Sequence, residues 1–425
     1  EIGSGLVGSE MCIRDSIETL GAKAKAAEHA AASASAKLKN EALKSIADAL
    51  IQNTGLIIEK NKLDLENAVK NGMSVSMQDR LMLNEKRISD IASSVLKLIE
   101  AEDLIGSVDY GVIRPNGLKI CKTRVPLGVI GIIFESRPNV CVDIAALCLK
   151  TANACVLKGG RDALYTNKAL KGLMRQAIAE ITDSNCITLI ADTNREITDW
   201  LLTQREYIDL LIPRGGKGLI QYVVSHAKIP YIETGAGNCH LYIHDKADLD
   251  MAIRIAINAK YQRPSVCNSI ETILVDEKIA AAFLARLYPE FSRRKIEIRG
   301  CEKTAGWIPC KRAVEEDYDT EYNDYIVAVK VVEDIDEAIE HINRHSSKHS
   351  ETIVTESHTA SRKFLNEIDS ACVYHNASTR FTDGGEFGFG AELGISTQKL
   401  HARGPMGLRE ICCYKYKIYG EGQVR

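Results

Sequence analysis

Hydrophobic residues recur at helical spacing through the first hundred residues of the chain. Two stretches show this most clearly, because in each the apolar positions fall on one helical face. They are Leu43, Ile46, Ala47, Leu50 and Ile51, and then Ile88, Ile91, Val95, Leu98 and Ile99. The pattern predicts an N-terminal helical layer over residues 17–101.

From residue 127 onward, short continuous apolar runs alternate with helical stretches. Buried strands are expected at 127–134, 154–157, 187–190 and 208–212, with helices near 140–152, 167–180 and 194–203. A second block places strands near 240–243, 269–275, 326–332, 352–354 and 371–375, and helices near 249–260, 277–287, 335–344 and 358–367. Such alternation predicts an α/β protein with two doubly wound parallel sheets.

Two other segments predict a small β element. Asn116-Gly117 separates two alternating runs within 109–125, which is a strong signal for a two-residue hairpin turn. The tail, 404–425, contains a strand-like run rich in Tyr, Ile and Cys that could pair with this hairpin on another subunit. We therefore expect domains at 17–236 and 237–403, with 109–125 and 404–425 as an oligomerisation element.

Residues 1–16 stand apart from this plan. They lack the charged start and apolar centre of a signal peptide, and they do not continue the helical pattern that follows. We interpret them as a cloning or read-assembly remnant, or as an unrelated extension.

Composition limits the class of protein. A chain of 425 residues exceeds what one core usually holds, and its formal net charge of −3 does not suggest a nucleic-acid binder. The longest apolar run, 127–134, is too short to span a bilayer. The 13 cysteines are scattered without a CxxC pair, which is typical of reduced thiols in a cytosolic protein. Cys141, Cys148 and Cys155 lie in apolar surroundings, so we expect them to be buried.

Cys267 differs from the other cysteines. It ends a polar, basic stretch that runs directly into an apolar β-branched strand, so it has access to solvent at the edge of a buried element. Arg263 nearby favours the thiolate, which is the nucleophilic form. Asn139, at the end of the first predicted strand, offers an amide donor suited to an oxyanion, although it could equally cap the helix that follows.

Two basic, glycine-rich turns follow buried strands. Pro213-Arg-Gly-Gly-Lys-Gly218 has the strand–turn–helix arrangement that presents backbone N–H groups to a phosphate, and Arg214 and Lys217 add positive charge. Lys158-Gly-Gly-Arg161 closes another strand and could hold a ribose and a 2′-phosphate. The alternative for both is a solvated turn.

Other polar groups have less specific signals. Glu233 is either a general base or a solvated carboxylate at a strand end, and the hydroxyls and arginine of 376–385 suit a phosphate or carboxylate. His341 and His345 lack the Glu of HExxH and an evident third ligand, so we expect no metal site. Cys239-His240 should present its side chains to opposite faces of a strand, as a buried thiol beside an outward imidazole.

Five long motifs together resemble a known family. They are RVPLGVIGIIFESRPN (124–139), LIPRGG (211–216), QRPSVCN (262–268), NASTRFTDGG (376–385) and STQKLHARGPMG (396–407). The chain resembles the γ-glutamyl phosphate reductases, also called glutamate-5-semialdehyde dehydrogenases, of the aldehyde dehydrogenase superfamily. The resemblance extends over nearly the whole chain and implies an aldehyde dehydrogenase-like fold, with the NADP site in the first domain and the nucleophile in the second.

The resemblance implies a reaction and roles for particular residues. The reaction is NADPH-dependent reduction of L-glutamyl 5-phosphate to glutamate 5-semialdehyde, through a thioester on Cys267 with Asn139 as oxyanion donor. The residues matched to NADPH are Lys158, Gly159, Arg214, Gly215, Gly216 and Glu321. The residues matched to the substrate are Arg137, Arg263, Ser378, Thr379 and Arg380. The resemblance also implies a cytoplasmic homo-oligomer, a dimer or tetramer, acting after a separate glutamate 5-kinase in proline biosynthesis.

Three other functions remain open on the sequence. The first is a hydrolytic NAD(P)-dependent aldehyde dehydrogenase that uses Glu233 as its base. The second is a non-catalytic nucleotide-binding or scaffold protein, and the third is a cysteine-dependent acyltransferase that needs no nicotinamide.

Overall fold

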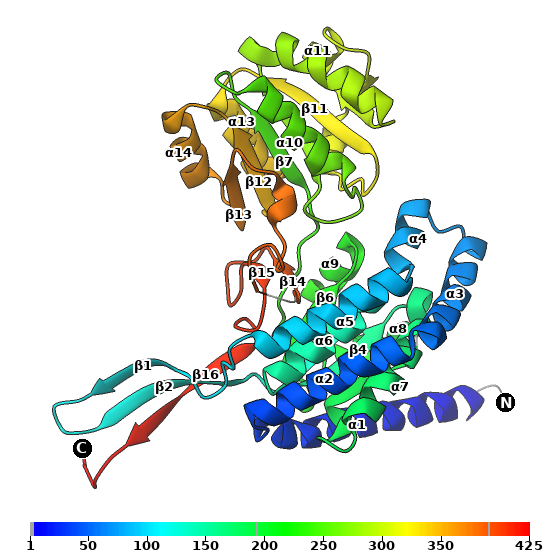
Figure 1. Cartoon of the computed structure of the whole chain (residues 1–425), viewed down its shortest axis with the longest axis vertical. Helices are drawn as coiled ribbons and strands as arrows, with labels where there is room; N and C mark the ends of the chain where they lie inside the picture. Colours follow the sequence, from blue (N-terminus) through cyan, green and yellow to red (C-terminus); the bar gives the residue numbers. More distant parts are fainter. Residues whose placement is uncertain (1–3, 193, 390–391) are drawn as a thin grey trace. The chain divides into compact units, whose positions relative to one another are not determined.

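The computed structural model describes residues 4–192, 194–389 and 392–425 and divides into two compact units (Figure 1). The first comprises Glu1–Glu233, Gly388–Gly394 and Met406–Arg425, and the second Thr234–Phe387 and Ile395–Pro405. The boundary between the two units thus lies after Glu233, three residues before the predicted boundary after residue 236. The structure also assigns 388–394 and the small β element to the first unit, because their contacts are made there.

The N-terminal layer consists of five helices. They are α1 (Ser4–Ala32), α2 (Ala36–Gln52), α3 (Thr54–Lys70), α4 (Val75–Leu81) and α5 (Glu85–Glu100). The predicted apolar face of α2 is buried at Leu43, Ile46, Ala47 and Leu50, whereas Ile51 is exposed. Helix α1 is continuous from Ser4, so the expectation that residues up to 16 would not join the helical pattern is wrong for 4–16.

The first parallel sheet has the strand order β5-β4-β3-β6. Its strands are β3 (Val129–Phe134), β4 (Ala154–Gly159), β5 (Ile187–Ile190) and β6 (Leu210–Arg214). Helices α6 (Pro138–Lys150), α7 (Leu164–Ile178), α8 (Arg195–Leu201) and α9 (Lys217–His226) alternate with them. All six residues of β3 are buried, as expected for a strand covered on both faces. The chain reverses its direction of sheet growth at β3, and such switch points are where open α/β sheets bind ligands.

The second unit contains a larger parallel sheet with the order β10-β9-β11-β8-β7-β12-β13. Its strands are β7 (Cys239–Ile243), β8 (Ile270–Asp276), β9 (Glu297–Gly300), β10 (Lys311–Arg312), β11 (Ile326–Val332), β12 (Ser350–Val354) and β13 (Cys372–His375). The accompanying helices are α10 (Leu249–Tyr261), α11 (Glu277–Arg293), α12 (Glu302–Ala305), α13 (Ile335–His345) and α14 (His358–Glu367). Of these strands and helices, the sequence pattern missed the short elements β9, β10 and α12. The doubly wound architecture is confirmed.

The small β element is a three-stranded antiparallel sheet, β1-β2-β16. It consists of β1 (Val108–Ile113), β2 (Lys119–Pro126) and β16 (Cys412–Tyr419). The tail strand β16 pairs with β2 of its own chain, from Cys412 opposite Pro126 onward, so the expected pairing with another subunit is corrected. Two further short strands, β14 (Gly394–Ser396) and β15 (Gly404–Met406), pair with each other.

The hairpin turn also differs from the expected two-residue form. The Gly117 N–H donates to the Arg114 carbonyl at 2.9 Å, and the Arg114 N–H donates to the Leu118 carbonyl at 2.8 Å. Gly117 has a φ of 88°. The loop is therefore a three-residue connection in which Gly117 takes the left-handed position, which a glycine adopts without steric cost.

Among the helices of the described residues, none is long and apolar enough to cross a membrane.

Candidate active site

Cys267 lies on the segment between helix α10 and strand β8, in the second unit. Its side chain is half-buried, whereas Cys141, Cys148 and Cys155 are buried as predicted. The neighbouring Ser269 is buried and donates its hydroxyl to the Ala259 carbonyl at 3.0 Å. The thiol is therefore on a short loop that is fixed to the end of α10.

The backbone of Cys267 packs directly against Gly237. A Cβ added to Gly237 would overlap the Cys267 carbonyl, so only glycine allows this approach. The Gly237 N–H donates to Glu321 Oε1 at 2.8 Å, and the Cys239 thiol donates to the Cys267 carbonyl at 3.2 Å. Glu321, which the family resemblance assigns to the cofactor, thus uses one carboxylate oxygen to hold Gly237, and Gly237 in turn packs against the cysteine loop.

Three residues that follow β13 hold the same loop from another side. Thr379 is buried and donates its hydroxyl to the Asn268 carbonyl at 2.6 Å. Asn268 Nδ2 donates to the Thr382 carbonyl at 2.9 Å, and the Arg380 guanidinium contacts Asn268 Oδ1. The Ser378 hydroxyl accepts from the Arg380 N–H at 3.3 Å and caps the short 3₁₀ helix of Thr379–Phe381.

Arg380 brings a positive charge close to Cys267. Its side-chain hydrogen bonds go to two neutral amide oxygens, of Gln262 at 3.1 Å and of Asn268, and no described carboxylate forms an ion pair with it. Burial lowers the pKa of Arg380, the charge of Cys267 opposes that shift, and the nearby Arg263 adds to it. The second unit therefore presents its nucleophile candidate beside a cation that bonds to amide oxygens, with the charge of Asp383 near that cation.

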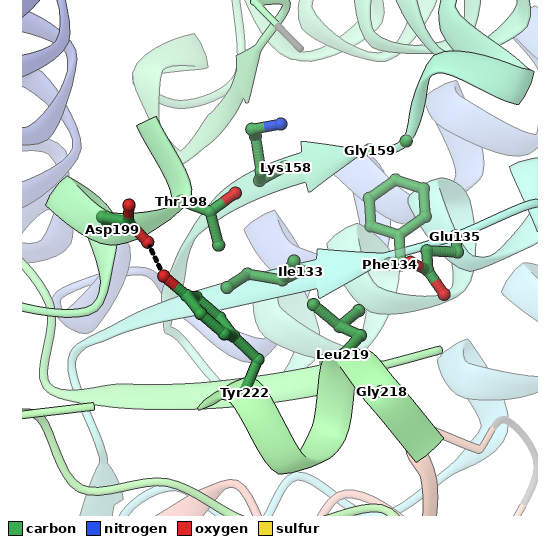
Figure 2. Close-up of a pocket in the computed structure, with 11 residues that line it drawn as sticks. Ile133, Phe134, Glu135, Lys158, Gly159, Thr198, Asp199, Gly218, Leu219 and Tyr222 are labelled. Atoms are coloured by element: carbon green, nitrogen blue, oxygen red, sulfur yellow. Dashed lines mark hydrogen bonds between the residues drawn. The ribbon is translucent and has the colours of Figure 1, made fainter. Parts of the chain in front are cut away.

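The first unit contains a cavity of about 510 Å³ at the carboxyl ends of β3 and β4 and beside the start of α9. It is lined by Ile133, Phe134, Glu135, Lys158, Gly159, Gly160, Thr198, Asp199, Gly218, Leu219 and Tyr222. Figure 2 shows Lys158, Thr198 and Tyr222 around this space, with the Tyr222 hydroxyl bonded to Asp199. Burial lowers the pKa of Lys158, and its ammonium forms no hydrogen bond with a described residue.

The glycine-rich turn after β6 lies next to this cavity. Gly216 is the N-cap of α9, and its N–H donates to Glu135 Oε2 at 3.1 Å. Arg214 Nε is buried and has no hydrogen-bond partner within the described part of the chain. The side chain of Lys217 lies outside the described residues. Within the described residues, neither Arg214 Nε nor the Lys158 ammonium has a hydrogen-bond acceptor, and the N-terminus of α9 lies beside them. These groups together suit an anionic dinucleotide such as NADP(H).

Asn139 lies in the first turn of α6, in the first unit. The N-cap of α6 is Arg137, so the alternative that Asn139 caps the helix is wrong. Instead, Asn139 Nδ2 donates to Asp143 Oδ2 at 3.0 Å. Just before this helix, Ser136 has a φ of 44°, an uncommon value for a residue with a side chain, and donates its hydroxyl to Asp162 at 2.7 Å.

The remaining candidates have more limited support. Glu233 is half-buried, and burial raises the pKa of its carboxyl group. His240 is buried rather than outward, because both faces of its sheet are covered, and its Nδ1 contacts Glu351 Oε2 at 3.0 Å. Burial and the neighbouring His240 and Lys330 lower the pKa of His341. Among the described residues, no group of three or more His, Cys, Asp or Glu side chains is placed to hold a metal ion.

Sequence reasoning did not assign roles to Gly237, Thr382, Glu135 or Asp143. Asn139 and Asp143 are four residues apart on a helix, and this spacing could have predicted their contact. The roles of Gly237 and Thr382 depend on contacts with Cys267 and Asn268, which are distant in sequence. No local pattern reports such contacts.

Comparisons with known proteins agree on the family. Residues 9–305 match the model of the aldehyde dehydrogenase family. The γ-glutamyl phosphate reductase of Halothermothrix orenii is 50% identical over 98% of this chain and 100% of its own length. The crystal structure of the Thermotoga maritima γ-glutamyl phosphate reductase has a TM-score of 0.90 and 47% identity, covering 96% of this chain and 99% of that one. An engineered glycolyl-CoA reductase with bound NADP+ shares the fold, with a TM-score of 0.70 and 16% identity over 94% of this chain and 96% of its own.

Proposed function

Because the chain belongs to the γ-glutamyl phosphate reductases of the aldehyde dehydrogenase family, we propose that it reduces L-glutamyl 5-phosphate to L-glutamate 5-semialdehyde with NADPH. Phosphate is the other product, and the reaction is the second step of proline biosynthesis. The observation that carries this proposal is the half-buried Cys267 on a braced loop, beside the Arg380 guanidinium, which bonds to amide oxygens and forms no ion pair with a described carboxylate. A nucleophile next to a cation suits a substrate whose leaving group is an anion.

The proposed chemistry begins at Cys267. Its thiolate forms a bond to the acyl carbon and the bond to the phosphate oxygen breaks, which leaves a thioester and inorganic phosphate. Asn139 Nδ2 and the Cys267 N–H would stabilise the tetrahedral oxyanion, and one such donor is worth about 3 kcal/mol in comparable sites. After reduction of the thioester carbonyl, the carbon–sulfur bond breaks, and the aldehyde and the thiolate are released.

We assign the substrate anions to the arginines around Cys267. Arg380 and Arg263 would hold the phosphate or the α-carboxylate, with Ser378 beside them, and Arg137 is a further candidate for binding these anions. The Thr379 hydroxyl already donates to the Asn268 carbonyl, which favours a bracing role over direct substrate contact.

NADPH would occupy the cavity of the first unit, and when bound it would supply the hydride. Lys158 and Gly159 would hold its ribose, with Arg161 near the 2′-phosphate. Arg214, Gly215 and Gly216 would face the pyrophosphate, where the unpaired Arg214 Nε gains an acceptor. Glu321 would reach the nicotinamide ribose with the oxygen that does not accept from Gly237.

The test measures the reaction in reverse. Oxidation of glutamate 5-semialdehyde, followed as NADPH formation, should require inorganic phosphate and should be lost in Cys267→Ala. Turnover that proceeds equally without phosphate would instead support the hydrolytic aldehyde dehydrogenase with Glu233 as base. In that case Glu233→Gln would abolish the activity, whereas the reductase should keep its rate within about twofold, since no water is activated.

We also propose that the protein is a homo-oligomer that uses the sheet β1-β2-β16. This sheet exposes large apolar side chains on one face, including Tyr110, Tyr416 and Ile418. Contiguous exposed apolar surface on a sheet is typical of a protein–protein contact. Replacing Tyr416 and Ile418 by Lys should shift the sedimentation coefficient to that of a monomer, and an unchanged coefficient would contradict the proposal.

A further inference from the structure

Helix α6 is almost completely buried, with two exceptions. Of its residues Pro138–Lys150, all are buried except Asn139 and Asp143. These two side chains are spaced by four residues, so they lie on the same face, and Asn139 Nδ2 donates to Asp143 Oδ2 at 3.0 Å. The one opening on this helix therefore holds a hydrogen-bonded amide and carboxylate.

The chemistry of this pair decides which end of the Asn139 amide faces Asp143. An asparagine side chain has a donor end and an acceptor end of nearly equal shape, and an ionised carboxylate can only accept. Asp143 therefore holds the Nδ2 end toward itself and leaves the second N–H of Nδ2 available. If the amide were rotated, its oxygen would face a carboxylate, and an oxyanion would meet no donor there.

We propose that Asp143 is a positioning residue, which fixes the Asn139 amide so that an N–H rather than the carbonyl oxygen faces the oxyanion. This inference rests on the oxyanion role proposed above for Asn139. The alternative is that the pair only stabilises the helix surface, as many i,i+4 hydrogen bonds do.

The surroundings of Asp143 make the orientation sensitive to pH. Besides Asn139 on its own helix, the charged groups that face it are Arg214 of β6 and Glu392 of the segment before β14. Burial raises the pKa of Asp143 to about 6, and Glu392 adds to the shift, while Asn139 and Arg214 oppose it. Below this pH a protonated Asp143 can donate to the amide oxygen, so the preference for one orientation is lost.

The experiment is a double-mutant cycle on the full-length enzyme. Asp143→Asn keeps the shape of the side chain but can itself rotate, so it no longer fixes Asn139. We expect kcat for phosphate-dependent oxidation of glutamate semialdehyde to fall by about tenfold or more, with KM for NADP unchanged within about twofold. Asn139→Ala should lose more, about 100-fold, as for other oxyanion donors. Combined with Asn139→Ala, the Asp143 change should cost nothing further, because both act through one amide.

The pH dependence of kcat provides a second test, because loss of a merely structural contact would not change it. The wild-type kcat should decline as pH falls through about 6, and this limb should disappear in Asp143→Asn and persist in Asp143→Glu. The exposed Asp48→Asn on α2, with the same change of charge, should leave kcat and its pH limb unaltered.

Different failures point to different errors. If Asn139→Ala is impaired while Asp143→Asn keeps the wild-type kcat and pH limb, or if the two effects multiply fully, the positioning role is overturned and the proposed reaction stands. If Asn139→Ala retains full activity, the oxyanion assignment and the positioning role both fall. If turnover does not depend on phosphate, the proposed reaction itself is wrong, whatever Asp143 does.

Discussion

The nucleotide cavity of the first unit and the Cys267 loop of the second unit are built in different ways. The cavity is formed at the ends of consecutive parallel strands, by residues close in sequence to those strands. The cysteine loop is fixed by Gly237, Glu321 and the Thr379–Thr382 segment, each far from it along the chain. We therefore expect a substitution in the nucleotide cavity to change the affinity for the nucleotide by a modest factor. We expect the removal of one distant contact to the Cys267 loop to lower the catalytic rate.

The largest effect should come from Gly237→Ala in the second unit. Its Cβ would overlap the Cys267 carbonyl, so the loop must move, and displacement of a reacting group by about 1 Å can cost about 100-fold in rate. We expect kcat to fall by at least that factor, with NADPH binding to the first unit retained in a fluorescence titration. The control is Gly172→Ala on α7, where an added Cβ meets nothing within 4 Å. A Gly237→Ala enzyme with normal kcat would show that the loop tolerates displacement.

Thr379→Val should have a smaller effect on the same loop. The variant keeps the shape of a buried side chain but leaves the Asn268 carbonyl without its 2.6 Å hydrogen bond, which typically costs about 1–3 kcal/mol. We expect a lower melting temperature and a kcat reduced by about tenfold. If KM for the semialdehyde rose while kcat stayed normal, Thr379 would be a substrate contact after all.

The same contrast explains how far the sequence could be interpreted. The strands at 187–190 and 326–332 are found at their predicted bounds, because buried parallel strands carry a continuous apolar signal. The glycine-rich turn at Arg214 and the position of Lys158 follow from the same strand-end rule. The bracing of Cys267 was not predictable in this way, since Gly237 and Thr379 act through contacts that only the fold creates. The short strand β9 was missed because its four residues alternate too briefly to be distinguished from a turn.

Lys158→Ala should alter the first unit without affecting the chemical step. Removal of an ammonium group that faces the cavity should raise KM for NADPH by about tenfold, or about 1.4 kcal/mol, while kcat at saturating NADPH stays within about twofold. The matched control is Lys168→Ala, an exposed lysine on α7, which should leave KM unchanged. A loss of kcat without a change in KM would contradict the proposed division of roles between the two units.

Glu135→Gln should produce the smallest effect and in the opposite direction. The Glu135 carboxylate accepts from the Gly216 N–H at the start of α9, where the dipole and the free N–H groups favour an anion. Before the pyrophosphate of NADPH can use this turn, the carboxylate must leave it, and its charge also repels the incoming phosphates. A neutral amide of the same shape removes that repulsion, so the dissociation constant for NADPH should fall by about two- to fivefold. Because the repulsion between exposed charges is screened by salt, the difference between the variant and the wild type should shrink as ionic strength rises. Weaker binding of NADPH by Glu135→Gln in this titration would instead assign the carboxylate to a direct contact with the cofactor, for example with a ribose hydroxyl.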